Sequence, residues 1–335
     1  MRIILSRTDS IGDVILTLPM AGILKEKFPG CKVIFLGRNY SRPLVEACRF
    51  VDEFVDWELI SGPGNCGSGE SSAKPAPSEA LAGLRADVII HVFPVKEICN
   101  AAKAASIPKR IATSHRFFTV LTCNHLLHYS RRYSLLHEVQ LNLKLLKPLG
   151  INKKFVLKEI FKYYGLTINH SGVKEAPRNE RFKLILHPKS NGNAREWGLD
   201  NFGKLIDLLP PEKFDISITG NREEGSAMRG FLDAYHNRIT DLTGKLSLPQ
   251  LLELIAGCDA LIAASTGPLH IAAALGIRAI GLYAPMRPIF SQRWAPLGEK
   301  ADFLGLAGKC NDCRRSGDCH CIRSIPPERV LEKLN

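Results

Sequence analysis

The segment "RIILSRTDSIGDVILTLPMAGILKEKFPGCKVIFLG" (residues 2–37) sets the fold class. Short apolar runs at residues 2–6 and 32–37 have the composition of buried strands, and residues 18–30 between them have the spacing of an amphipathic helix. Strand, helix and strand in this order form a parallel pair with a crossover helix, and the helix-like residues 42–57 continue the alternation. The sequence therefore predicts an α/β fold with a parallel sheet.

A second set of the same elements follows the polar stretch at residues 167–181. Strands are predicted at residues 182–188, 214–220, 260–265 and 278–285, and helices at residues 199–210, 247–258 and 267–276. We therefore expect two doubly wound, Rossmann-like domains, residues 1–168 and 169–335, that face each other across a cleft. Such sheets bind ligands at the carboxyl ends of their strands, so both domains should present binding loops to this cleft.

One segment of the first half does not fit the alternation. Residues 61–80 are rich in Gly, Ser, Pro and Ala and have almost no large apolar side chains, which predicts a flexible insertion. A buried strand is expected again at residues 86–94. An amphipathic helix is expected at residues 137–151, where Pro-Leu-Gly ends it.

The overall composition is that of a soluble globular protein, since 45% of the residues are hydrophobic and 23% are charged. The apolar runs are shorter than the roughly 18–20 residues that cross a bilayer, and residues 1–10 lack the features of a secretory signal. We expect a cytoplasmic protein. Lys and Arg outnumber Asp and Glu by 45 to 33, a formal net charge of +12. This excess favours nucleic acid, an anionic membrane surface or phosphorylated substrates as partners.

The ten cysteines fall into two groups. Six are scattered singly and are expected to be reduced thiols, as is usual in a large cytosolic protein: Cys31, Cys48, Cys66, Cys99, Cys123 and Cys258. The other four, Cys310, Cys313, Cys319 and Cys321, lie together in a Cys-rich tail, residues 310–321. Four thiols at this spacing could hold one structural Zn²⁺, and free or redox-active thiols are the alternative.

The stretch "ASTGPLHIAAALG" (residues 264–276) follows a predicted strand and opens a predicted helix. Thr266 is placed to cap this helix, and Gly267 lets the backbone come close to a ligand. Free N–H groups and the positive end of the helix dipole would then form a pocket for a phosphate or diphosphate, to which His270 could add a hydrogen bond. A plain strand-to-helix turn with a surface histidine is the alternative.

Two further loops follow strand ends in the second half. The loop "HPKSNGNAREW" (residues 187–197) carries Lys189 and Arg195, and a guanidinium in a flexible loop suits capture of a phosphate. The loop "TGNREEG" (residues 219–225) places Glu224 where a carboxylate could accept hydrogen bonds from ribose hydroxyls. Solvated loop charges and an exposed acid at a helix start are the alternatives.

In the first half, "SIGDVILTLPM" (residues 10–20) places Asp13 between Gly12 and a run of apolar residues. The positive end of a helix stabilises a carboxylate, so a capping or dipole role is a sufficient explanation from these residues alone. Pro19 predicts a kink or a late start of the helix behind it.

Five motifs follow one another along the chain: "RxDxIGDVILTLPxxxxLKxxFP" (residues 7–29), "HEVQLNLKLLKPLG" (137–150), "HPxSxxxxREW" (187–197), "STGPLHIAAALG" (265–276) and "CIRSIPPERV" (321–330). Together they resemble the ADP-heptose:lipopolysaccharide heptosyltransferase group, family nine of the glycosyltransferases. The resemblance implies a GT-B fold and an inverting glycosyltransferase that uses no metal ion and no cofactor. The N-terminal domain would hold the acceptor sugar, and the C-terminal domain would hold the sugar nucleotide.

The resemblance also implies roles for individual residues. An inverting transfer needs a general base on the acceptor hydroxyl and positive charge or N–H donors on the departing diphosphate. Asp13 would be the base, and Arg195 the basic catalytic residue. The donor-binding residues would be Lys189, Glu224, Ser265, Thr266, Gly267, Pro268 and His270.

Basic runs at residues 109–118 and 128–134 lie in the half that would bind the acceptor. Lipid A and Kdo carry phosphates and carboxylates, so Arg110, Arg116 and Arg131 are expected to contact the acceptor. Because the membrane surface is also anionic, these runs favour peripheral binding to the inner face of the cytoplasmic membrane. Solvated helix faces are the alternative.

Two positions depart from the family pattern. Arg195 stands where the family usually has a lysine, which exchanges a compact ammonium for a planar fork. Ser265 stands where the family usually has an acid close to the donor sugar. The second departure leaves open which sugar is transferred.

We therefore expect transfer of a heptose from ADP-heptose to a lipopolysaccharide inner-core acceptor, with another nucleotide-sugar donor or glycan acceptor as the alternative. A non-catalytic nucleotide or nucleic-acid binding protein is a further hypothesis, but no aromatic-rich RNA signature or recognition-helix pattern supports it. A dinucleotide oxidoreductase is disfavoured because neither strand-to-helix turn reads GxGxxG.

Overall fold

The computed structural model describes residues 1–62, 75–132, 134–168, 181–192, 194–306, 310 and 319–334. Its contacts divide the chain into two compact units. Unit 1 consists of Met1–Ser134, Glu138–Val156 and Lys162–Gly165, and unit 2 consists of Leu135–His137, Leu157–Phe161 and Leu166–Asn335. Residues 63–74, most of the predicted insertion, lie outside the described residues.

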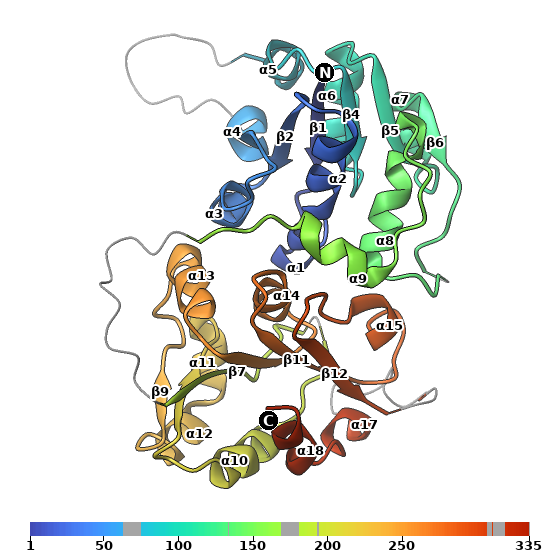
Figure 1. The fold of residues 1–335 in the computed structure, drawn as a ribbon. Coiled ribbons are helices and arrows are strands. Elements are labelled where there is room, and N and C mark those ends of the chain that lie inside the picture. Colours follow the sequence, from blue (N-terminus) through green and yellow to red (C-terminus); the bar gives the residue numbers. More distant parts are fainter. Residues whose placement is uncertain are drawn as a thin grey trace, which may run out of the picture. The chain divides into compact units, whose positions relative to one another are not determined.

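In its described residues, unit 1 contains a six-stranded parallel sheet with the strand order β3-β2-β1-β4-β5-β6 (Figure 1). The strands are β1 (Arg2–Ser6), β2 (Lys32–Gly37), β3 (Glu53–Asp56), β4 (Val88–His91), β5 (Lys109–Thr113) and β6 (His125–Leu127). The helices are α1 (Ile11–Ile15), α2 (Pro19–Lys27), α3 (Arg42–Glu46), α4 (Trp57–Ser61), α5 (Pro77–Gly83), α6 (Lys96–Ala104), α7 (Phe117–Thr122) and α8 (Glu138–Leu143), with the 3₁₀ helices η1 (Asn39–Ser41) and η2 (Lys144–Leu149).

Unit 2 repeats this plan with the strand order β12-β11-β10-β7-β8-β9. Its strands are β7 (Phe182–His187), β8 (Phe214–Ile218), β9 (Ile239–Asp241), β10 (Ala260–Ala264), β11 (Arg278–Tyr283) and β12 (Ala301–Gly305). The helices are α9 (Leu157–Ile160), α10 (Leu199–Leu208), α11 (Arg222–Ala227), α12 (Arg229–Ala234), α13 (Leu248–Ala256), α14 (Gly267–Ala274), α15 (Ser291–Trp294), α17 (His320–Arg323) and α18 (Pro327–Glu332). The 3₁₀ helix η3 (Phe161–Tyr163) follows α9, and its last two residues belong to unit 1.

Both sheets therefore have the strand order of Rossmann folds, in which the chain direction across the sheet reverses beside the first strand. The reversal lies between β1 and β4 in unit 1 and between β7 and β10 in unit 2. Ligands of such sheets bind outside the carboxyl ends of the strands at this switch point. The loops after these four strands are thus the first places to look for a functional site.

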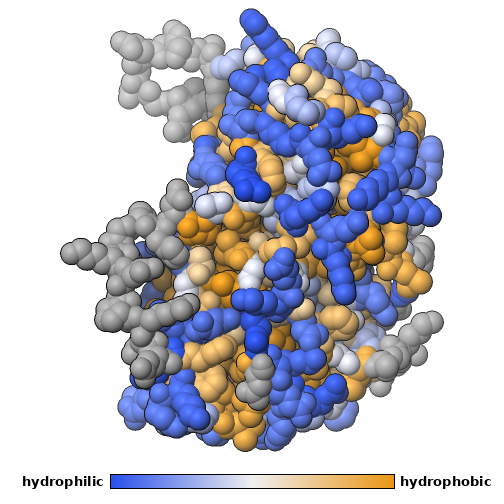
Figure 2. All heavy atoms as spheres, viewed as in Figure 1, coloured by the Kyte–Doolittle hydropathy of each residue, from blue (hydrophilic) through white to orange (hydrophobic). Residues whose placement is uncertain are grey.

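Both faces of each sheet are covered, so the central strands are buried along nearly their whole length. In unit 1, Ile4 and Ile89 pack against Leu81 of α5 and Ile98 of α6. In unit 2, a larger core includes Trp197 and Phe202, whose rings meet edge to face with centroids 4.9 Å apart. On the face seen in Figure 2, hydrophilic side chains are interspersed with apolar patches. Among the helices that the structure describes, none combines the length and apolar character that a membrane-spanning helix requires.

The structure corrects two of the predicted elements and, at residues 109–118, the alternative of a solvated helix face. Residues 42–57 were expected to be helical, but α3 ends at Glu46 and β3 occupies Glu53–Asp56. β3 pairs with β2 and forms one edge of the sheet. The basic run at residues 109–118 contains a strand, β5, before α7 begins. The helix expected at residues 137–151 changes to a 3₁₀ helix after Leu143, and Pro148 lies inside that second part. Pro19 is the first residue of α2, which confirms the late helix start.

Candidate active site

The switch point of unit 1 carries a cluster of charged side chains centred on Arg7, which directly follows β1. The Arg7 guanidinium is buried and donates to both carboxylate oxygens of Asp9 at 2.7 and 3.0 Å. It also contacts the carboxylate of Asp13 directly. A third donor, Nη1, lies 3.3 Å from the side-chain oxygen of Asn142. One buried arginine thus holds two carboxylates at the carboxyl edge of the sheet.

A second arginine, Arg131, also belongs to this cluster. Arg131 forms an ion pair with the buried Glu138 and donates to the side-chain oxygen of Asn142 at 2.9 Å and to the backbone oxygen of Val92 at 3.2 Å. Val92 directly follows β4, so the contact spans the switch point. We call the set Arg7, Asp9, Asp13, Arg131, Glu138 and Asn142 the switch-point cluster.

Asp13 is the member of this cluster best placed to reach a ligand. It lies in the first turn of α1 and its side chain is 19% exposed. Ser10 donates to its Oδ2 atom at 2.5 Å. Burial is the main cause that raises the pKa of Asp13 above its ordinary value, and the nearby Asp9 and Glu138 add to this rise, whereas Arg7 and the Ser10 hydrogen bond oppose it. The carboxylate is therefore a stronger proton acceptor than an ordinary aspartate.

The other two cations predicted for acceptor binding have different surroundings. The Arg110 guanidinium donates to the backbone oxygens of Ile107 and Thr122 at 2.6 and 2.7 Å, so it ties β5 to the end of α7. The Arg116 guanidinium lies over the ring of Phe93, 4.9 Å from its centroid. Phe93 is in the loop after β4, so Arg116 lies near the switch point. Arg110 instead holds β5 against the end of α7.

In unit 2, the start of α14 has two polar atoms for which the described residues offer no hydrogen-bond partner. Thr266 is the N-cap residue, but its side chain makes no capping hydrogen bond, and its Oγ1 atom is buried. His270 is also buried, and its Nδ1 atom is without a partner. The prediction that Thr266 is the cap residue of this helix is confirmed, but its side chain makes no capping hydrogen bond. The alternative of a surface histidine is wrong.

Burial lowers the pKa of His270 to about 3, and the nearby His137 adds to this effect. The imidazole is therefore neutral at physiological pH. It can donate or accept a hydrogen bond at the start of α14, but it supplies no positive charge there. Pro268 has no N–H group, so the backbone donors nearest the helix start are those of Gly267 and Leu269.

The loops after β7 and β8 meet beside this helix start. His187, the last residue of β7, hydrogen-bonds the Thr219 hydroxyl through Nδ1 at 2.9 Å. Lys189 forms an ion pair with Glu196 at 2.7 Å. Glu224 accepts a hydrogen bond from the backbone N–H of Asn221 at 2.8 Å, as part of the capping box of α11. The side chains of Lys189 and Glu224 thus have structural partners before any ligand binds.

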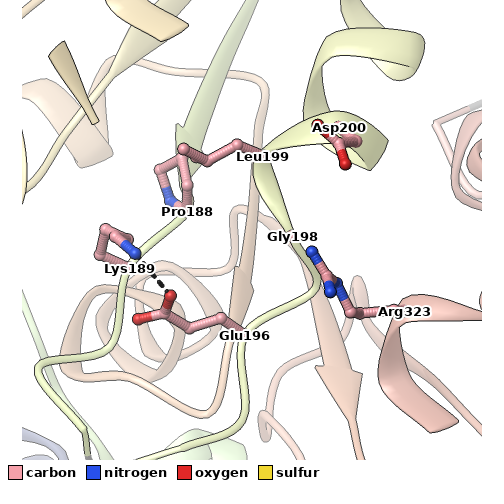
Figure 3. Close-up of a pocket in the computed structure, with 7 residues that line it drawn as sticks. All are labelled: Pro188, Lys189, Glu196, Gly198, Leu199, Asp200 and Arg323. Carbon is pink, nitrogen blue, oxygen red and sulfur yellow. Dashed lines mark hydrogen bonds and ion pairs between the residues drawn. The ribbon is translucent and has the colours of Figure 1, made fainter. Parts of the chain in front are cut away.

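A cavity of about 450 Å³ opens beside Lys189 (Figure 3). Its lining residues come from the loop after β7, the start of α10 and the end of α17: Pro188, Lys189, Glu196, Gly198, Leu199, Asp200 and Arg323. Gly198 has a φ angle of +97°, and a Cβ atom there would lie 2.9 Å from Nε of Arg323. Arg195 is half-buried on the same loop but does not line the cavity.

Most of the Cys-rich tail, including Cys313, lies outside the described residues. Cys319 is part of the buried core of unit 2, and Cys310 and Cys321 pack against that core. The predicted four-thiol zinc site is therefore not tested.

Sequence reasoning missed the partners of the residues that it selected. Arg7 and Asp9 stand directly after a predicted strand, and Glu138 and Asn142 are four residues apart, which puts them on one face of a helix. Those two local signals could have suggested a polar cluster. The hydrogen bond between His187 and Thr219 joins two strand ends that are far apart in the sequence, and no local signal indicates it.

Comparison with known proteins identifies the group to which these features belong. The model of Glycosyltransferase family 9 (heptosyltransferase) matches residues 95–320. The chain is 25% identical to lipooligosaccharide heptosyltransferase 2 of Haemophilus influenzae over 100% of this chain and 99% of that protein. It is 30% identical to lipopolysaccharide heptosyltransferase 2 of Escherichia coli over 43% of each.

Solved structures agree on the fold. The structure of E. coli ADP-heptose lps heptosyltransferase II matches with a TM-score of 0.75 at 20% identity and covers 100% of this chain and 98% of that chain. E. coli heptosyltransferase WaaC with ADP matches with a TM-score of 0.71 at 16% identity over 100% of both chains. The predicted α/β fold of the GT-B class, with two Rossmann-like domains, is confirmed.

Proposed function

The chain belongs to glycosyltransferase family 9, the heptosyltransferase family, and is a glycosyltransferase; from this premise we propose that it transfers a heptose from ADP-heptose to an inner-core lipopolysaccharide acceptor, with inversion at the anomeric carbon and without a catalytic metal ion. The observation that carries this proposal is the similarity to lipooligosaccharide heptosyltransferase 2 of Haemophilus influenzae, because it extends over nearly all of both proteins. Unit 1 would bind the acceptor and unit 2 the donor.

Inverting transfer is a single displacement at the anomeric carbon. The acceptor oxygen bonds to this carbon while the bond from the carbon to the diphosphate oxygen breaks, and ADP leaves with both electrons of that bond. The proton of the acceptor hydroxyl passes to Asp13. General-base catalysis of this kind contributes about 10²–10⁴-fold to a rate.

The surroundings of Asp13 support its role as the base. Its side chain reaches solvent, and each carboxylate oxygen can accept a further hydrogen bond beyond those from Arg7 and Ser10. Its raised pKa increases its proton affinity, while the positive charge of the buried Arg7 favours the ionised form. These two opposing influences suit a group that must be charged at rest and must gain a proton during transfer.

On the donor side, the start of α14 would receive the diphosphate. The backbone N–H of Gly267 and the Thr266 hydroxyl would donate to phosphate oxygens, and the neutral His270 would add a hydrogen bond through its unpartnered nitrogen. Ser265 and Pro268 would shape the turn. Because His270 brings no charge, Lys189 and Arg195 would supply the cations that stabilise the departing diphosphate, and Glu224 would approach the ribose.

Of the three arginines predicted to contact the acceptor, Arg131 and Arg116 lie near the unit 1 switch point. Arg131 belongs to the switch-point cluster, and Arg116 packs on Phe93 beside it. Both would face phosphates or carboxylates of the acceptor. Arg110 would act indirectly, since its guanidinium is engaged by two backbone oxygens.

We further propose that unit 1 binds the anionic membrane surface peripherally through α7. This short helix exposes three apolar side chains, Phe117, Val120 and Leu121. Cations flank it, because Arg116 precedes the helix and Lys103 donates to the backbone oxygen of Leu121 at 3.0 Å. An exposed apolar face with flanking cations suits the interface of an anionic bilayer, where a lipid-linked acceptor would lie.

The alternative is a different nucleotide sugar or glycan acceptor with the same chemistry. Ser265 stands at the turn into α14, and its hydroxyl hydrogen-bonds the buried Tyr283. A serine there removes the negative charge that the family usually has near the donor sugar. With no carboxylate at this position, a donor with a different sugar would lose no contact between a carboxylate and a sugar hydroxyl.

The donor question is decided by assaying transfer from ADP-heptose, ADP-glucose, UDP-glucose and GDP-mannose onto Kdo-lipid A acceptors, with and without EDTA. We expect a product heavier by one heptose only with ADP-heptose, at a rate that EDTA leaves unchanged. The anomeric configuration of the product, measured by NMR, should be opposite to that of the donor. Transfer from another nucleotide sugar alone would establish the alternative.

A further inference from the structure

Three potential metal ligands that are not members of the switch-point cluster meet in the core of unit 1. They are His91 at the end of β4, Cys99 in α6 and Cys123 directly after α7. The ligand atoms of the three side chains all lie within 4.8 Å of one another. His91 and Cys99 are fully buried, and Cys123 is 8% exposed. Among the residues that the structure describes, this is the one group of three or more such side chains close enough to hold a metal ion.

The imidazole of His91 is the most unusual member. Neither ring nitrogen forms a hydrogen bond of good geometry within the described part of the chain, although the Cys123 sulfur interacts with the ring. Leaving a buried polar group unpaired costs about 1–3 kcal/mol per group, and native proteins rarely tolerate it without a functional reason. A ligand for one of these nitrogens would remove the penalty.

The two thiols belong to one small buried cluster of unit 1, formed by Cys99, Ala112 and Cys123. Neither is an exposed surface thiol. Thiolates, not thiols, bind metals, so each sulfur would lose its proton when the ion binds.

A fourth buried polar group lies on the same face of the sheet. Ser6 of β1 is the register partner of His91 in β4. Adjacent residues in parallel register direct their side chains to the same side. The Ser6 Oγ atom is buried and, like the two nitrogens of the His91 ring, forms no hydrogen bond of good geometry in the described structure. Two neighbouring orphaned groups beside two thiols point to a common missing ligand.

We propose that His91, Cys99 and Cys123 bind one structural Zn²⁺, with the Ser6 hydroxyl or a water molecule in the fourth position. Two sulfurs and one imidazole nitrogen form a donor set that suits zinc, which prefers four ligands of the N and S type. The ion would tie β4, α6 and the end of α7 together. It would have no part in the transfer reaction, and it is independent of the Cys-rich tail.

The first test is the zinc content of the full-length protein, purified under reducing conditions and measured by mass spectrometry of the metal. Cys99→Ser and Cys123→Ser are compared with Cys258→Ser, a matched control that changes another buried cysteine, in unit 2. We expect each of the first two variants to contain about one zinc ion per chain less than the wild type and the control. Any zinc bound by the Cys-rich tail would be present in all four proteins, so it does not affect the difference in zinc content between them. Equal zinc content in all four proteins would overturn the proposal.

A second variant separates metal binding from simple packing. His91→Leu removes the imidazole but keeps an apolar side chain of similar size. In a metal-free core this change removes an unpaired polar group, so it would leave the melting temperature unchanged or raise it. With zinc bound, the melting temperature should fall, and a chelator should lower that of the wild type but not that of the variant. A higher melting temperature for His91→Leu than for the wild type would contradict the zinc site. So would a Cys99–Cys123 disulfide in the protein purified under reducing conditions.

Discussion

The buried guanidinium of Arg7 contacts the carboxylate of Asp13, and the same guanidinium holds Asp9 through two hydrogen bonds. One cation thus pairs with two acids at the switch point of unit 1. The positive charge of Arg7 opposes the effect of burial, which raises the pKa of Asp13. The arrangement also makes the site dependent on residues far along the chain, because Glu138 and Asn142 complete the surroundings of Arg7.

The switch-point cluster should be essential for stability. Glu138→Ala removes the buried carboxylate that pairs with Arg131 and leaves that guanidinium without its counter-charge. Breaking a buried pair on one side costs about 3–5 kcal/mol, and we expect a loss of this size in the free energy of unfolding measured with urea. Glu58→Ala is the control, because its ion pair with Arg38 is mostly exposed and should contribute about 1 kcal/mol or less. Equal effects of the two changes would contradict this account of the cluster.

His270 should make the protein sensitive to acid. Its pKa is about 3 in the folded state and about 6.5 when unfolded, so below pH 6.5 the unfolded chain binds a proton that the folded chain does not. The free energy of unfolding should therefore fall as the pH falls, by about 2 kcal/mol from this residue between pH 6.5 and pH 5.

Replacing His270 with Leu should remove that part of the pH dependence. The exposed His236, changed to Leu in the same way, serves as the control. The measurement is urea denaturation at a series of pH values. If the free energy of unfolding changes with pH in the same way for the wild type and for His270→Leu, His270 is not buried in its neutral form.

Two glycines should respond to alanine in opposite directions. Gly198, beside the unit 2 cavity, has a φ of +97°, so Gly198→Ala should lower the free energy of unfolding by about 1–3 kcal/mol. Gly230 in α12 has open space around its Cα and an ordinary helical position, so Gly230→Ala should raise it by about 0.5–1 kcal/mol. Thermal or urea unfolding of both variants measures the two shifts, and a stabilised Gly198→Ala would be inconsistent with the backbone described.

If α7 binds the membrane, negatively charged side chains on its exposed face should strongly weaken binding to anionic vesicles. The double change of Phe117 and Leu121 to Glu should reduce binding to anionic vesicles on the order of tenfold or more, because two apolar groups no longer enter the interface. Their side chains are 78% and 57% exposed, so the fold should tolerate the change. Val156→Glu is a matched control at an equally exposed apolar position in unit 1. Flotation with phosphatidylglycerol vesicles is the measurement, and equal binding by all three proteins would exclude α7.

The sequence predicted the alternation of strands and helices well where strands are buried on both faces. The run at residues 2–6 became β1 and residues 260–265 contain β10, because continuous apolar runs mark the centre of a covered parallel sheet. Strands away from the centre of the sheet were harder. Lys109 and Arg110 begin β5, which lies between β4 and the edge strand β6, but their charges resemble a solvated helix face until these pairings are known.

The candidate site was predictable only in part for a similar reason. Local position and family resemblance selected Asp13, but its pKa depends on Arg7, Asp9 and Glu138, which act through space. Likewise, the sequence placed His270 one turn into a helix, but its burial comes from tertiary packing. Motifs therefore identified which residues to examine, and the structure was needed to learn their charge state and partners.

The most direct test of the central claim is the rate of heptose transfer by Asp13→Asn, compared with Asp9→Asn. Both changes remove an acid that contacts Arg7, so damage to the switch-point cluster should affect both variants alike. If Asp13 is the base, its variant should lose at least about 100-fold in kcat with little change in KM, whereas Asp9→Asn should lose much less. Circular dichroism and unfolding midpoints would confirm that both variants are folded. A folded Asp13→Asn protein that transfers heptose as fast as Asp9→Asn would contradict the account.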